Sequence, residues 1–356
     1  MRWRAILRVD GRKVTRTCSS KRAANNWVAE QKTAINRGTH VDPRGGDTLF
    51  ADWAEIWWAG RDAMGTRTSR SSVRGRLDNH ILPTFGKLAL GDVRLALVQQ
   101  WVNRLSATLA PRTVRHCYTI LSAIFNAAID DRRLLANPCR SPSGRGLRLP
   151  KKVPVEQVAL DGEQIQRLIA AFPPYWRPLI TTMADTGVRY SEAAGLRVRY
   201  VDLVGGEIKI REVYSDRDGW RDYPKTTAGW RTVTIPRLLA EVLAPLCEGK
   251  GLDDAVFTTP RGHLLTYRNF RVQVWDPAVE VAGLAAERPT PKSLRHAHAS
   301  LLAAAGMATV AQSRLGHATP AMTANVYTHR LPGMDDVALA IIEAAVHGVP
   351  DTPAGL

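Results

Sequence analysis

The feature that most constrains the fold is the stretch from residue 138 to residue 154, which reads PCRSPSGRGLRLPKKVP. It contains four prolines, two glycines and five Lys or Arg residues, and it has no acidic residue. Proline lacks the backbone N–H that helices and sheets use, and glycine is costly to order, so such a stretch does not form regular structure. We therefore expect an extended basic linker at 138–154, with separately folding units on either side.

The segment before this linker has the periodicity of a helical bundle. Apolar residues recur at helical spacing in FADWAEIWWAGR (Phe50, Trp53, Ile56 and Trp57) and in TVRHCYTILSAIFNAAIDD (Leu121, Ile124, Phe125 and Ala128). An apolar residue at every third or fourth position forms a stripe that packs on a core. Residues 48–137 are therefore expected to form an all-helical domain.

Residues 1–47 indicate a much smaller unit. RWRAILRV and RKVTRT alternate polar and apolar residues around Asp10-Gly11, a dipeptide favoured in tight hairpin turns. Ser20 is suited to cap a following helix, in which Trp27 belongs to an apolar face. The unit holds eleven Lys or Arg against four Asp or Glu, a local net charge of +7. A hairpin and helix with this charge are suited to bind the phosphate groups of a nucleic acid.

The segment after the linker mixes helices with strands. Leu160-Asp161 precedes GEQIQRLIAAF as an N-cap pattern, and PYWRPLITTMADTG predicts a helix that ends at Gly187. GEIKIREVY and WRTVTIP alternate as strands. We therefore expect a multi-domain, mainly α protein, in which an α+β domain at 155–347 carries one small antiparallel sheet and 348–356 is a tail.

The charge balance narrows the class of partner. The chain has a net charge of +16 and a pI near 10.2, and such an excess of positive charge attracts nucleic acid by releasing its counterions. A basic protein with a merely solvated surface is the alternative that composition leaves open.

Composition also bears on the compartment. No apolar run approaches the roughly 18 residues that a membrane span requires, and the N-terminus lacks the apolar core and cleavage site of an export signal. We therefore expect a cytoplasmic protein with no membrane contact. The four cysteines are too scattered for a zinc site or a disulfide framework: Cys18, Cys117, Cys139 and Cys247.

Residues suited to cleave a DNA strand without a metal occur in four short segments. Such cleavage needs a fixed nucleophile, positive donors around the phosphate and a proton for the departing sugar oxygen. The candidates are Arg189 and Glu192 in TGVRYSEAAGLR, Lys225 in YPKTTAGWRTVTIP, Lys292 and Arg295 in TPKSLRHAHASLLAAAG, and His317 and Tyr327 in LGHATPAMTANVYTH. Lys225 is expected at the tip of a hairpin. Each candidate is a common residue when taken alone. It is the presence of all of them in this order that indicates strand cleavage.

In this order, the segments resemble the tyrosine recombinase family, specifically phage-type integrases. The resemblance covers 48–345 in architecture and 186–329 in motifs. It implies a site-specific DNA recombinase that cleaves and rejoins strands through a 3′-phosphotyrosine intermediate, integrating or excising a phage or another mobile element. Such a reaction preserves the energy of the phosphodiester bond, so no metal, ATP or other cofactor is expected.

The resemblance also implies a role for each matching residue. Arg189 and Arg295 would hold the scissile phosphate, and His317 would assist by hydrogen bonding or proton handling. Lys225 would protonate the 5′-oxygen leaving group. Tyr327 would be the nucleophile.

One position departs from the commonest family pattern, because Lys292 stands where a histidine usually precedes the xLR triplet. Lysine donates a hydrogen bond and a charge to phosphate, but it does not accept a proton at neutral pH as a neutral imidazole does. Glu192 matches the acidic position of the family, with a structural rather than a chemical role. His296 and His298 are expected to pack or to support their neighbours.

By the same resemblance, residues 1–47 would be an arm-type DNA-binding domain and 48–137 a core-binding, SAM-like domain. Relatives carry a three-stranded sheet in the arm domain. Only two strands are recognisable here, so either one strand is absent or the domain begins upstream of Met1. The implied partners are double-stranded DNA attachment sites, a homo-tetramer on DNA, and DNA-bending or directionality proteins. The amphipathic segment DDVALAIIEAAVHG would dock on a neighbouring protomer or on its own domain.

Three alternatives share part of this pattern. A non-catalytic DNA-binding regulator would keep the fold, but the intact set of candidate residues argues against it. A type IB topoisomerase uses the same chemistry without exchanging partners, and the arm and helical domains favour an integrase over it. Transposases of mobile elements share every motif.

Overall fold

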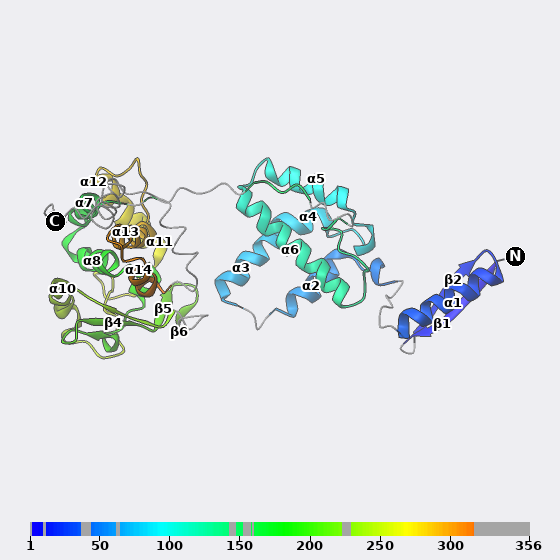
Figure 1. Ribbon diagram of the computed structural model, residues 1–356, viewed down its shortest axis with the longest axis horizontal. Helices are drawn as coiled ribbons and strands as arrows, with labels where there is room; N and C mark the ends of the chain where they lie inside the picture. Colours follow the sequence, from blue (N-terminus) through cyan, green and yellow to red (C-terminus); the bar gives the residue numbers. More distant parts are fainter. Residues whose placement is uncertain are drawn as a thin grey trace, which may run out of the picture. The chain divides into compact units, whose positions relative to one another are not determined.

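The chain divides into two compact units, Met1–Pro154 and Val155–Leu356 (Figure 1). The computed structural model describes residues 2–9, 12–36, 44–61, 65–141, 147–151, 158, 160–222 and 229–316. Most of the regular structure in these ranges is helical, with small antiparallel sheets, which confirms the predicted fold class. No helix in these ranges is long and apolar enough to cross a membrane.

The N-terminal part of the first unit is an antiparallel pair of strands covered by one helix. These elements are β1 (Trp3–Val9), β2 (Arg12–Cys18) and α1 (Lys21–Asn36). Ser20 Oγ accepts a hydrogen bond of 3.1 Å from the backbone N–H of Ala23, so the predicted helix cap is confirmed. Trp27 is buried in a small core with Leu7. The turn expected at residues 10 and 11 lies outside the described residues.

The rest of the first unit contains a helical bundle, as predicted. Its helices are α2 (Phe50–Ala59), α3 (Arg67–Arg76), α4 (Leu82–Phe85), α5 (Leu95–Ser106) and α6 (Pro111–Asp130). The predicted stripe of α6 is fully buried: Leu121, Ile124, Phe125 and Ala128. Ile56 is 55% exposed, so its predicted place in the core is wrong. The buried face of α2 runs through Phe50, Trp53 and Ala54, because residues three and four apart share one helix face.

Part of the predicted linker packs on this bundle. Cys139 is fully buried in the bundle core, and Tyr118 Oη donates to its carbonyl at 2.8 Å. Further along, the Gln99 side chain donates to the Arg148 carbonyl at 3.1 Å and accepts from the Arg148 N–H at 2.8 Å. Residues 147–151 have no helix or strand, as expected. Their backbone is nevertheless held to the bundle, because a side-chain amide satisfies both of its polar groups here as a neighbouring strand would.

The second unit surrounds a single large core with helices. Its helices are α7 (Gly162–Ala171), α8 (Arg177–Thr186), α9 (Tyr190–Ala194), α10 (Arg237–Cys247), α11 (Tyr267–Phe270), α12 (Asp276–Val281), α13 (Pro291–Ala304) and α14 (Ala308–Leu315). Asp161 and Gln164 form a capping box that starts α7, as the sequence pattern predicts. Helix α8 ends where expected, because Gly187 adopts a left-handed φ of 64°.

The described residues of this unit form two small sheets, where one was predicted. The strands are β3 (Val201–Asp202), β4 (Glu207–Ile210), β5 (Glu212–Ser215), β6 (Gly219–Asp222) and β7 (Arg231–Thr234). One sheet has the order β3-β4-β7, and β5 pairs with β6 in the other. The turn of the β5–β6 hairpin is at 216–218. Lys225, which the sequence predicts at a hairpin tip, comes between β6 and β7 in the chain and lies outside the described residues.

Candidate active site

A pocket of about 270 Å³ in the second unit brings together three of the predicted site residues. These are Arg189, which precedes α9, and Lys292 and Arg295 on α13. The other lining residues include three tyrosines and one acidic residue: Tyr190, Tyr214, Tyr267 and Asp216. Three cationic side chains from two distant parts of the sequence therefore border one small cavity.

Arg189 is held at the pocket by the way α8 ends. Gly187 turns the chain, and Arg189 occupies the N-cap of α9 with an extended backbone. Its Nη1 lies 2.6 Å from Glu192 Oε1, and its backbone N–H donates to Glu192 Oε2 at 2.9 Å. Because both groups bond the same carboxylate, the guanidinium has a defined direction, and its side chain remains 35% exposed.

Helix α13 supplies the other two cations. It starts with a capping box between Thr290 and Ser293, and Lys292 and Arg295 are three residues apart on one face, as predicted. Arg295 is only 4% exposed. Its Nη1 donates to the Gly187 carbonyl at 2.8 Å, and its Nη2 donates to the Leu315 carbonyl.

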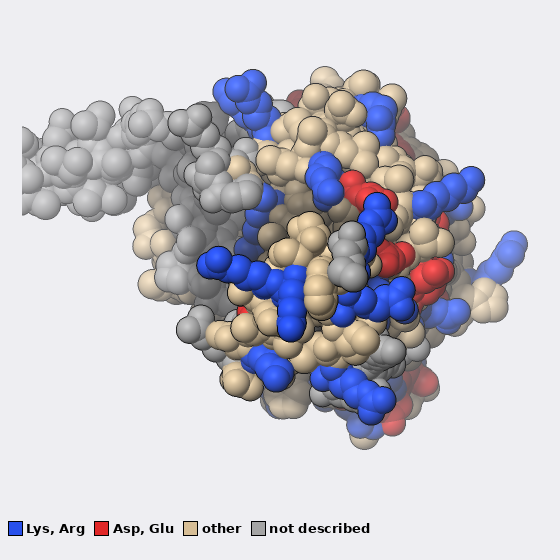
Figure 2. Space-filling model, turned by 90° about the vertical axis from the view of Figure 1, so that its right-hand side faces the viewer, with Lys and Arg blue, Asp and Glu red and all other residues tan. Residues whose placement is uncertain are grey.

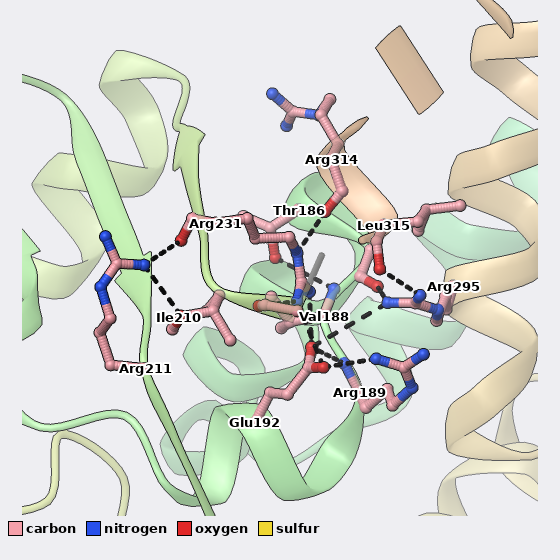
Figure 3. A network of polar contacts seen from close by, with 12 residues as sticks. Thr186, Val188, Arg189, Glu192, Ile210, Arg211, Arg231, Arg295, Arg314 and Leu315 are labelled. Carbon is pink, nitrogen blue, oxygen red and sulfur yellow. Dashed lines mark hydrogen bonds and ion pairs between the residues drawn. The ribbon is translucent and has the colours of Figure 1, made fainter. Parts of the chain in front are cut away.

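Glu192 is the common partner of three arginines (Figure 3). It is 1% exposed, and its carboxylate accepts two hydrogen bonds from Arg231, of which the Nη2–Oε2 bond is 2.6 Å long. Arg189 contacts the same carboxylate, and Arg295 Nη1 lies 4.0 Å from it. Burial by itself raises the pKa of Glu192, but Arg231, followed by Arg189 and Arg295, lowers it to about 2. The carboxylate is therefore charged at neutral pH and has the structural role expected for it.

Arg231 was not among the predicted site residues. It begins β7, whose residues alternate between buried and exposed, and it occupies one of the inward positions next to Val233. A charged residue at an inward position of an alternating strand indicates a buried partner. The sequence contains this signal, but it does not identify Glu192, 39 residues away, as the partner.

His298 packs behind the site, as expected. It is 8% exposed, its Nδ1 lies 3.0 Å from the Ala184 carbonyl, and its Nε2 accepts a hydrogen bond of 3.2 Å from Arg314 Nε. Burial and then the charge of Arg314 lower the pKa of His298 to about 4. A neutral imidazole can therefore accept the hydrogen bond from Arg314 without adding charge.

Gly187 is packed so closely that it leaves no room for a side chain. A Cβ at Gly187 would lie 2.7 Å from Leu315 Cδ2 and 2.8 Å from His298 Cδ2, whereas at Gly206, which has the same φ of 64°, the nearest atom is 3.7 Å away. We expect Gly206→Ala to cost about 1 kcal/mol from backbone strain alone, and Gly187→Ala to cost about 2–4 kcal/mol because overpacking is added. Urea unfolding of both variants measures this, and equal losses would contradict the crowding argument.

Tyr190 places a buried hydroxyl beside the pocket for which the described residues provide no hydrogen-bond partner. An unpaired buried hydroxyl costs about 1–3 kcal/mol, so Tyr190→Phe is expected to leave the free energy of unfolding unchanged or to raise it. Tyr118→Phe is the matched control, because it removes a hydroxyl that is hydrogen-bonded to Cys139, and it is expected to cost about 1 kcal/mol. Thermal unfolding in which Tyr190→Phe is the less stable variant would contradict this interpretation.

The remaining predicted residues, Lys225, His317 and Tyr327, lie outside the described residues. Their nearest described neighbours are Asp222 at the end of β6 for Lys225, and Gly316 after α14 for His317. No cluster of three or more His, Cys, Asp or Glu side chains suited to a metal ion occurs within the described ranges.

Comparison with sequence families gives two matches along the chain. The model described as "Phage integrase family" matches residues 159–333, and "Phage integrase central domain" matches residues 50–145. A prophage phiRv2 integrase of Mycobacterium tuberculosis is 30% identical over 360 residues, covering 96% of this chain and 92% of the relative. The integrase of Mycobacterium phage L5 is 27% identical over 328 residues, covering 86% of this chain and 84% of the relative.

Solved structures share the fold at lower sequence identity. The Tn1549 transposon integrase in complex with a circular intermediate DNA is 19% identical, with a TM-score of 0.66, over 83% of this chain and 99% of that one. A lambda integrase tetramer bound to a Holliday junction is 17% identical, with a TM-score of 0.61, over 92% of this chain and 93% of that one. Both units of the chain therefore have counterparts in proteins of known structure.

Proposed function

The chain belongs to the phage integrase family and is a site-specific tyrosine recombinase, and from this premise we propose that it cleaves and rejoins DNA through a 3′-phosphotyrosine bond to Tyr327. In the cleavage step, the phenolic oxygen gives up its proton and attacks the phosphorus, and the bond to the 5′-oxygen breaks. The leaving 5′-oxygen receives a proton. Attack by the 5′-hydroxyl of another strand reverses these changes and releases Tyr327, which makes the reaction a strand transfer.

The observation that carries the proposal is the convergence of Arg189, Lys292 and Arg295 on one pocket. Negative charge develops on the non-bridging oxygens of the phosphate in the transition state, and preorganised cationic donors stabilise it. Arginine presents several N–H donors in a planar fork that matches phosphate geometry. Because Glu192 and two backbone carbonyls fix the directions of Arg189 and Arg295, little reorganisation is needed at the moment of reaction.

The other roles are proposed from the family resemblance. Lys225 would donate the proton to the 5′-oxygen, and His317 would bond the phosphate or handle a proton. Lys292, which replaces the usual histidine, would add a hydrogen bond and a positive charge, but not a base. No cofactor has a role in this scheme.

Double-stranded attachment sites are the proposed substrate, and a homo-tetramer on two duplexes is the proposed working assembly. Lambda integrase has been captured as a tetramer on a Holliday junction. The net charge of +16 supports binding to DNA, and in the view of Figure 2 the exposed charged side chains are mainly Lys and Arg. The hairpin with α1 would bind arm sites, and the bundle would bind core sites. DNA-bending or directionality proteins would act with it, in the cytoplasm.

Trapping the covalent intermediate tests the chemistry. The full chain is incubated with nicked duplexes that tile the DNA flanking its gene, and adducts are separated on denaturing gels and digested for mass spectrometry. We expect a DNA adduct on the peptide that contains Tyr327. An adduct on another residue, or none on any duplex that the protein binds, would overturn the proposal.

A second assay separates recombination from topoisomerase activity. Supercoiled plasmids that carry two copies of the site at which the adduct forms are incubated with the protein. Recombined plasmids and relaxed plasmids are then scored on the same gel. We expect strand exchange between the two sites. Relaxation of supercoils without exchange would favour a type IB topoisomerase.

A further inference from the structure

Arg231 combines deep burial with contacts to two separate parts of the site. Its side chain is 5% exposed, and its Nη2 and Nη1 lie 2.6 and 3.3 Å from the two oxygens of Glu192. Its Nε donates to the backbone carbonyl of Arg314, in the last turn of α14 (Figure 3). One planar guanidinium therefore bonds the carboxylate that orients the arginines and also caps the helix that precedes His317.

The link between β7 and α14 is reciprocal. Arg231 of β7 donates to the Arg314 carbonyl, while Arg314 Nη1 donates back to the Thr234 carbonyl of β7 at 3.0 Å. Arg295 donates to the Leu315 carbonyl, the next one along α14. The last carbonyls of a helix have no partner within the helix, so these cations fix the direction in which α14 ends. His317 is two residues beyond this point.

Stability alone does not explain this arrangement. Burying an ion pair costs so much desolvation that well-packed apolar residues of similar volume are often equally stabilising. A buried arginine does offer fixed directions, because its donors lie in one plane. The contacts of Arg231 use this property, since they fall on Glu192 and on the end of α14 at the same time.

We propose that Arg231 is a positioning residue for strand transfer, which orients Glu192 between Arg189 and Arg295 and fixes the end of α14 from which His317 follows. This inference rests on the proposed function. Arg231 does not line the pocket. Its removal should therefore lower the rate of cleavage and leave DNA affinity largely intact.

The proposal predicts a specific change with pH. The charged groups that face Glu192 are Arg189 beside α9, Arg231 on β7 and Arg295 on α13. In Arg231→Gln the burial of Glu192 remains but its main counter-charge is lost, so the pKa of Glu192 rises. Below the raised pKa the carboxyl is neutral and no longer orients the two other arginines. The rate of this variant should therefore fall as the pH is lowered, and the fall should begin at a higher pH than in the wild type.

The experiment measures adduct formation by the full chain on a trapped duplex at saturating protein, with DNA affinity measured in parallel. We expect Arg231→Gln to form the adduct about 100-fold more slowly, as small misplacements of reacting groups do, and to show the new loss at acid pH. Arg314→Gln should also be slowed, because it removes bonds that hold the end of α14 to β7 and α8; its pH profile will also reflect His298, whose pKa Arg314 lowers. Arg237→Gln is the matched control on a 93% exposed side chain, and it should match the wild type throughout.

The outcomes separate this inference from the proposed function. If the wild type itself forms no adduct, the proposed function fails. If the wild type reacts and Arg231→Gln reacts equally fast, or slows with an unchanged pH profile, the positioning role is overturned. If Arg231→Gln does not fold, Arg231→Lys decides, because lysine keeps a charge near Glu192 but lacks the planar fork. A rate reduced about tenfold with the wild-type pH profile supports the inference, and the wild-type rate overturns it.

Discussion

Replacement of Tyr327 by phenylalanine is expected to abolish covalent attachment to DNA and to leave DNA affinity within about threefold of the wild type. The substitution removes one oxygen, which is the proposed nucleophile, so the phosphotyrosine bond cannot form. Affinity depends instead on Lys and Arg contacts with many phosphates, which the substitution does not alter. Denaturing gels score the adduct, and mobility shifts at fixed salt measure the affinity.

Tyr175→Phe is the matched control for this experiment. Tyr175 is 46% exposed, and its hydroxyl donates to the Thr259 carbonyl at 2.9 Å, away from the pocket. This variant should form the adduct at the wild-type rate. An adduct that persists in Tyr327→Phe would exclude Tyr327 as the nucleophile, and a large loss of DNA affinity in that variant would indicate that the phenol supports binding rather than chemistry.

The parts of the site that sequence predicts well are those set by local signals. Gly187 ends α8 and places Arg189 at the start of α9, and both follow from the chain's own turn chemistry. Likewise, Lys292 and Arg295 share a face of α13 because helix geometry relates residues three apart. These positions need no knowledge of the rest of the fold.

The parts that sequence misses are set by contacts between distant segments. The pairing of Arg231 with Glu192 joins a strand to a helix 39 residues away. The linker segment 147–151 is held by Gln99, which is 49 residues from Arg148, although the composition of the segment alone indicates a free linker. The exposure of Ile56 also depends on tertiary packing. The spacing of apolar residues on α2 allows either of two adjacent faces to be buried, and contacts with the bundle select one of them. Local pattern does not contain this information.

Loss of the Glu192 carboxylate is expected to have the largest effect on stability among the substitutions considered. Glu192→Ala removes the buried counter-charge of Arg231 and a hydrogen-bonded partner of Arg189. Breaking a buried ion pair from one side costs about 3–5 kcal/mol. Urea unfolding of the full chain, with hydrogen exchange followed on peptides from α9 and α13, reports the effect on the second unit separately from the bundle.

Glu241→Ala makes the same change in an exposed pair, because Arg237 and Glu241 are 93% and 55% exposed, and it should alter stability by less than about 1 kcal/mol.

The pH dependence provides a second check. The folded pKa of Glu192, about 2, lies below the ordinary value for glutamate, about 4.3. A depressed pKa contributes stability above the ordinary value that is lost as the pH falls through the folded value. The difference in the free energy of unfolding between wild type and Glu192→Ala should therefore be largest at neutral pH and should shrink as the pH falls from about 4 toward 2. A difference that stays constant over that range would show that Glu192 stabilises the fold by packing rather than by charge.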